Sequence, residues 1–127
     1  MSAYTDKFDN HSVHTHLKTV QEELLSVEDM QDKPPVAIET LARVALVVKN
    51  FSLALETCNK NLVSMVWLDE SGKALANIKS YLTNYKSNKD VNALNNNCSG
   101  QLDVLLQTSA KINCVKSAQS LRGIVAA

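Results

Sequence analysis

The residues best suited to chemistry are three histidines that fall within six positions of one another: His11, His14 and His16. On a helix His11 and His14 share a face and could bind one metal ion, whereas His16 lies about 200° around the axis from His14. Asp9 could add a ligand only if the helix begins irregularly. Exposed histidines at a helix entry are far commoner than metal ligands. Metal binding by His11 and His14 is therefore the alternative interpretation.

The three cysteines, Cys58, Cys98 and Cys114, are the candidate nucleophiles. They form no CxxC pair and their number is odd, which favours a reducing compartment, here the cytoplasm. Cys58 and Cys98 fall on apolar rows, where a thiol is usually an inert core residue. All histidines are N-terminal, the carboxylates are scattered and there is no Gly-rich phosphate loop. We therefore predict no catalytic residues, no cofactor and no enzymatic activity.

Charge and hydropathy narrow the range of partners. Thirteen basic residues balance thirteen acidic ones, and no basic stripe concentrates the positive charge, so nucleic acid is not a predicted partner. No stretch reaches about 18 uninterrupted apolar residues, and the first ten residues lack the apolar run of an export signal. The sequence predicts a cytoplasmic protein that does not cross a membrane.

One apolar row, within residues 41–65, organises the prediction of the fold. Its members recur at alternating steps of three and four: Leu41, Val44, Val48, Phe51, Leu55, Cys58, Leu62 and Met65. This spacing is typical of a helix packed lengthwise against other helices. Apolar residues also fill positions 44–48 and 53–55, beyond one face, which predicts a helix surrounded by neighbours.

The other elements follow from similar rows and from helix breakers. Residues 1–10 are expected to be a flexible lead-in, from which Tyr4 and Phe8 could dock on the bundle. A row from Val13 to Val27 predicts a first helix that ends near residue 30, where Ser12 could cap the start. Pro34 and Pro35 then mark the boundary before the second helix, which Pro35 begins.

The second half contains two expected turns. The central row loses its phase after Met65, which places a turn at residues 69–72 and a third helix after it; the alternative is one helix over residues 36–87. Asp90 is a good N-cap for a fourth helix, in which Gly100 is expected to be tolerated at a close packing point; the alternative is a break of the helix at Gly100.

These elements predict an all-α fold: an antiparallel helical bundle of about four helices with one long central helix. Residues 11–127 would form one domain. The apolar ending at residues 123–127 fits either a docked terminal helix or the N-terminal domain of a longer protein, and both interpretations stay open.

The functional hypothesis is a non-enzymatic helical protein–protein interaction or oligomerisation module, such as an adaptor or regulatory domain. If the other helices cover only part of the apolar surface of the central helix, the uncovered part would pack against a second copy of the chain or a partner helix. The candidate seam residues are Leu41, Val48, Phe51, Leu55, Leu62 and Met65. Trp67, off the row, is a candidate anchor for a partner or a cover for the core. The alternative function is a ligand- or metal-sensing bundle.

Overall fold

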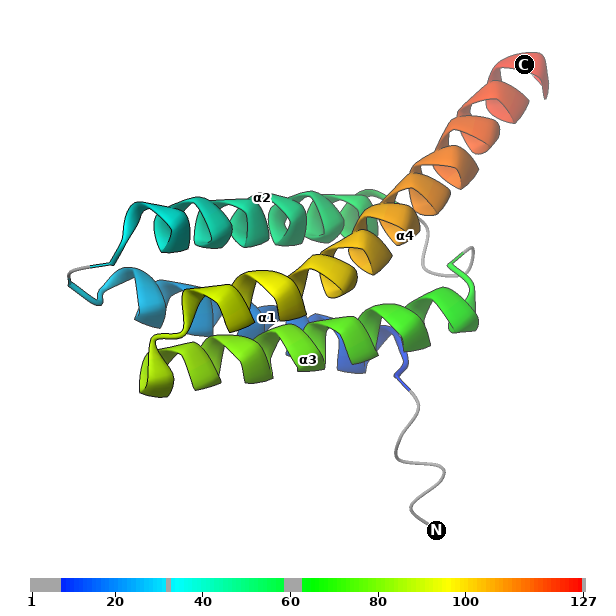
Figure 1. The fold of residues 1–127 in the computed structure, drawn as a ribbon. Coiled ribbons are helices and arrows are strands. Elements are labelled where there is room, and N and C mark those ends of the chain that lie inside the picture. Colours follow the sequence, from blue (N-terminus) through cyan, green and yellow to red (C-terminus); the bar gives the residue numbers. More distant parts are fainter. Residues whose placement is uncertain (1–7, 32, 59–62, 127) are drawn as a thin grey trace, which may run out of the picture.

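The computed structural model describes residues 8–31, 33–58 and 63–126, with side chains as far as Ala118. The described residues form four helices and no strand: α1 (Asn10–Glu28), α2 (Pro35–Thr57), α3 (Met65–Asn88) and α4 (Val91–Ala126). Consecutive helices run in opposite directions, and α4 runs obliquely to the others towards its C-terminus (Figure 1). The predicted all-α helical bundle is confirmed.

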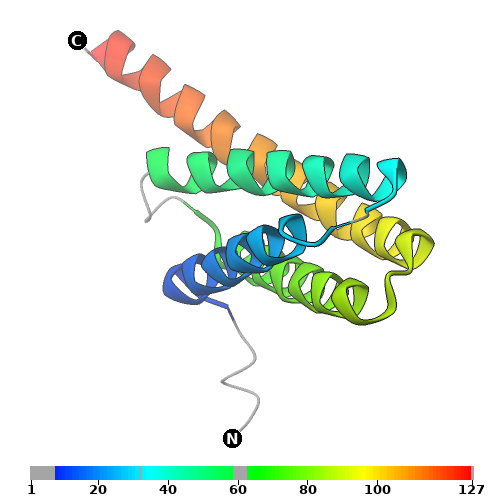
Figure 2. The same cartoon turned by 90° about the vertical axis from the view of Figure 1, so that its left-hand side faces the viewer.

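The helices do not pack in chain order. α1 packs on α3, α3 on α4 and α4 on α2, whereas α1 and α2 approach each other at far fewer points. Phe8 N donates to Asp69 Oδ1 over 3.2 Å at one end of α1, and Lys86 Nζ pairs with Glu23 over 2.8 Å near the other, so α1 and α3 run parallel. Figure 2 shows α2 lying across α1 on one side of the bundle. That side, between α1 and α2, is the loosely packed one.

The helix expected to continue through Met65 ends instead at Thr57. Cys58 has extended backbone, Leu62 lies outside the described residues, and Met65 begins α3, whose N-cap Ser64 accepts a hydrogen bond from Val66 N. The turn predicted at residues 69–72 and the single helix over 36–87 are both wrong. The apolar row kept its spacing across the polar sequence Asn59-Lys60-Asn61, so periodicity alone concealed the break.

Gly72 is therefore a residue of α3, not of a turn, and it is buried there. A Cβ atom at this position would overlap the ring of Phe8, so only glycine lets Phe8 lie this close to the helix. Docking of Phe8 is confirmed, and Tyr4 lies outside the described residues. Gly100 is tolerated within α4 as predicted, but no atom lies close to it, so it is not a close packing point.

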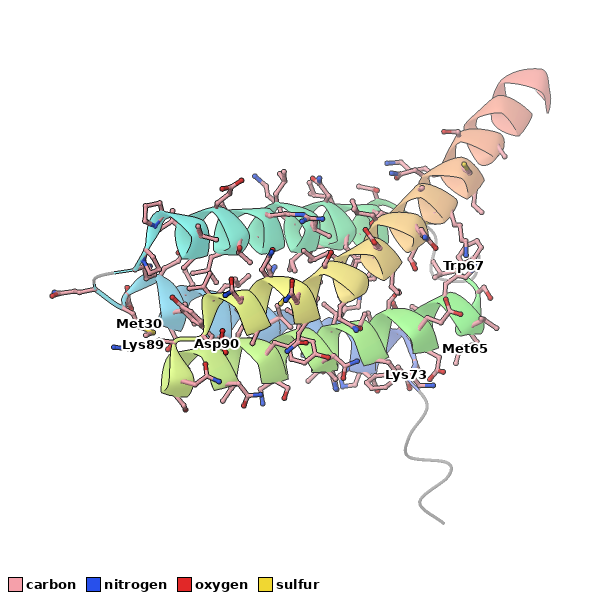
Figure 3. All side chains as sticks on the ribbon, viewed as in Figure 1. Met30, Met65, Trp67, Lys73, Lys89 and Asp90 are labelled. Carbon is pink, nitrogen blue, oxygen red and sulfur yellow. The ribbon has the colours of Figure 1, made fainter. Side chains whose placement is uncertain are left out.

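The helix caps explain where α1 and α4 begin. Asp9, and not Ser12, caps α1: its Oδ1 accepts from Ser12 N over 2.8 Å, and this bond is the main reason that the pKa of Asp9 is lowered. Asp90 caps α4 as predicted, because its Oδ1 accepts from Ala93 N over 3.1 Å. Figure 3 shows Asp90 and Lys89 at one end of the bundle and Met65 and Trp67 at the other.

The core runs the length of the bundle and draws on all four helices. Its largest fully buried side chains include Phe51, Leu75, Leu82 and Leu105. α2, however, contributes one face only, so the prediction that this helix is surrounded is wrong. The longest helix is α4, which continues beyond the end of α2 (Figure 1).

Candidate functional site

The most unusual surface of the chain is the side of α2 that faces away from the core. Ile38, Ala42, Leu46 and Leu53 recur there at spacings of four and seven, and we call them the α2 outer face. Leu46 is 60% exposed and Leu53 is 48% exposed. Four of the eight large exposed hydrophobic side chains among the described residues lie on α2. A helix packed only by its own chain usually carries polar residues on such a face.

A groove runs beside this face, between α1 and α2, with a volume of about 360 Å³. We call it the α1/α2 groove; its lining residues are Gln21, Leu24, Leu25, Glu28, Ala45, Val48 and Lys49. Leu24 and Val48 are core residues that form its apolar floor, and Leu25 is a largely exposed apolar residue at its edge. The groove thus extends the α2 outer face towards α1.

The connection between α1 and α2 caps the first helix and begins the second. Lys33 Nζ donates to the carbonyl oxygens of Val27 and Glu28, at 3.2 and 2.7 Å, and so caps the C-terminus of α1. Pro34 then precedes Pro35, the first residue of α2. α2 lines the groove with the buried Val48, the small Ala45 and the long, exposed Lys49.

The candidate seam residues have a different place. Leu41, Val48, Phe51 and Leu55 are buried in the core of a single chain, where they pack against its other helices. Met65 is 56% exposed but belongs to α3, so it does not continue their row. The residues that sequence reasoning missed are Leu46 and Leu53. Both are apolar but lie off the apolar row, and this position was interpreted as evidence for a second buried face of the helix.

Trp67 lies in the first turn of α3 and is partly buried against the core. The Nζ atom of Lys111 is 5.9 Å from the centroid of its ring, so α4 reaches over the tryptophan. This position covers one end of the α3/α4 pair (Figure 3).

The three histidines remain at the start of α1. His11 is exposed, His14 is half-buried, and the ring of His16 meets that of Phe8 edge to face with centroids 4.8 Å apart. Within the described ranges, no three His, Cys, Asp or Glu side chains come together as metal ligands. The structure therefore brings no further ligand to His11 and His14.

A groove of about 450 Å³ between α1 and α3 is lined mostly by polar residues, several of which are hydrogen-bonded within their own helices. The hydroxyls of Thr15, Thr19 and Thr83, which line it, each donate to a carbonyl of their own helix. Lys79 and His16 are the basic residues of its lining. These features do not define a ligand.

The thiols show no sign of activation. Burial raises the pKa of Cys98 to about 11, so its thiol stays protonated at neutral pH. Cys58 is buried and Cys114 is exposed, and all three are free.

Comparison with known protein families, characterised proteins and solved structures finds no match to this chain. In the described part of the chain, no helix combines the length and hydrophobicity needed to cross a membrane.

Proposed function

We propose that this chain is a non-enzymatic, cytoplasmic self-association module, and that its interface combines the α2 outer face with the α1/α2 groove. One observation carries the proposal: exposed apolar side chains are concentrated on α2, beside the one pair of neighbouring helices that packs loosely. Exposed apolar surface that gathers on one side of a molecule is typical of protein–protein contact sites.

The energetics favour association through this surface. Complete burial of a leucine or isoleucine side chain is worth about 1.5–3 kcal/mol, and Ile38, Leu46 and Leu53 are each roughly half exposed. Each can therefore contribute on the order of 1 kcal/mol, twice over in a symmetric dimer, against the entropy lost on association. The zero net charge adds no long-range repulsion between copies.

The test is the solution mass, measured by light scattering after size exclusion over a concentration series from about 1 µM to about 1 mM. The unaltered chain is expected to reach the mass of two or more chains, and Leu46→Asp/Leu53→Asp to stay monomeric with unchanged helix content. Met65→Asp/Val66→Asp is the matched control, because it removes two exposed apolar residues from the start of α3. An unaltered chain that is monomeric throughout would refute the proposal, as would a loss of association confined to the control.

A further inference from the structure

We propose that the α1/α2 groove of one copy binds the C-terminal part of α4, residues 113–126, from a second copy. This inference rests on the proposed self-association and names the segment that occupies the groove. We call residues 113–126 the α4 tail.

The described side chains of the α4 tail are mostly exposed. Ile112 is the last buried residue of α4 whose side chain is described; Asn113, Cys114, Ser117 and Ala118 are exposed, and Val115 is half-buried. Lys116, also exposed, donates from its Nζ to Thr57 Oγ1 at the end of α2 over 2.9 Å. The helix nevertheless continues to Ala126 and projects past the end of α2 (Figures 1 and 2). At 1.5 Å per residue, the tail is roughly 21 Å long.

The α4 tail also has an apolar pattern suited to packing. Most helical stability in proteins comes from packing of an amphipathic face. The tail sequence has apolar residues at helical spacing, namely Val115, Ala118, Leu121, Ile124 and Val125. Three- and four-residue steps of this kind are the pattern by which a helix binds an apolar groove.

The α4 tail and the α1 edge of the groove carry opposite charges. No acidic residue follows Asp103, so the last part of the chain carries only the positive charges of Lys111, Lys116 and Arg122. On α1, by contrast, Glu28 lines the groove, and Glu22 and Asp29 lie three and four positions from Leu25 at its edge. Lys49, on the α2 side, is the basic residue of the lining. Of the two salt bridges between described residues, neither involves these three carboxylates. A basic, apolar helix matches an apolar groove with an acidic edge.

The experiment uses two full-length variants with complementary defects, each checked for unchanged helix content. The groove variant is Leu25→Asp, at the groove edge, and the tail variant is Leu121→Asp/Ile124→Asp. We expect each variant alone to associate at least about tenfold more weakly than the unaltered chain. A one-to-one mixture should recover an oligomer by light scattering, since the intact tail of the first variant can bind the intact groove of the second.

The outcomes separate the two proposals. If the tail variant alone associates like the unaltered chain, the tail is not the occupant, and self-association through the α2 outer face still stands. If the mixture stays monomeric, docking of tail on groove is overturned. A monomeric unaltered chain would overturn both proposals.

A charge pair gives a milder version of the same test, which leaves the apolar residues in place. Arg122→Glu should weaken association. Raising the ionic strength should likewise weaken the association of the unaltered chain. Mixing Arg122→Glu with Glu28→Lys should restore part of the loss. Association that is insensitive to both the substitution and the salt would contradict the charge argument.

Discussion

α2 and α3 have nearly the same length, 23 and 24 residues, but the surroundings of the two helices differ. α3 packs closely against both α1 and α4, and its exposed large hydrophobic residues, Met65 and Val66, lie only in its first turn. α2 packs closely against α4 alone and leaves Ile38, Leu46 and Leu53 exposed along its length. The bundle thus contains one helix, α3, that is packed on two sides and one helix, α2, that is packed closely on one side only. We call α3 the sealed helix and α2 the open helix; α2 carries more apolar residues than its own chain buries.

The two faces of α2 should respond very differently to substitution. Phe51→Ala removes a fully buried ring and is expected to lower the free energy of unfolding by about 3–5 kcal/mol. Leu46→Ala, on the exposed face, should change the free energy of unfolding of the monomer by no more than about 0.5 kcal/mol. Urea unfolding, followed by circular dichroism at low protein concentration, measures both. Similar losses for the two variants would mean that Leu46 is packed by its own chain.

Packing of Phe8 against α3 depends on Gly72. Gly100, a glycine of α4, has no atom near its Cβ position and serves as the matched control. Gly72→Ala should destabilise the protein by about 1–3 kcal/mol, because its methyl group would displace the ring of Phe8. Gly100→Ala, where nothing lies nearby, should instead stabilise the protein by about 0.5–1 kcal/mol.

Thermal unfolding of both glycine variants checks the sign of each effect. A Gly72→Ala variant that is as stable as the unaltered chain would show that Phe8 does not rest on α3.

The end of the α3/α4 pair is tested by Trp67→Ala. Because Trp67 is partly buried beneath Lys111, its loss should reduce stability by about 1–2 kcal/mol. Self-association should not change, since the residue lies away from the α1/α2 groove. A loss of association with unchanged stability would make Trp67 an interaction anchor and weaken the contrast between the two sides of the bundle.

The smallest effect concerns the thiols and leaves the fold intact. At pH 8 the folded protein should take up one equivalent of iodoacetamide, at exposed Cys114, and three equivalents once it is denatured. Cys98 should be protected because burial raises its pKa to about 11, so that its reactive thiolate is scarce at this pH. Rapid labelling of Cys98 in the native state, detected by mass spectrometry of its peptide, would show that α4 opens there.

Much of the fold could be predicted from the sequence, because the evidence was local. The rows of α1, the Pro34-Pro35 boundary and the Asp90 cap each depend on nearby residues, and all were confirmed. The end of α2 was missed, since the row through Leu62 and Met65 kept a helical spacing across a polar break. Ser64 was the residue that could have indicated the start of a new helix, because serine is a preferred N-cap and its Oγ accepts from Val66 N.

The candidate site was harder to predict because it depends on which helices become neighbours. An apolar residue at Leu46 or Leu53 fits a buried second face as well as an exposed one, and only the packing order of the four helices distinguishes the two cases. Periodicity identified Phe51 and Leu55 correctly as apolar-row residues but could not reveal that the opposite face of α2 lacks a neighbour.

The most direct test of the contrast between α2 and α3 is amide hydrogen exchange on the unaltered chain at low and high protein concentration. We expect exchange in α2 and in the α4 tail to slow as concentration rises, because association would cover both, while exchange in α3 stays the same. Slowing confined to α3, or exchange that does not depend on concentration anywhere in the chain, would contradict the claim that the open side of the bundle is its self-association surface.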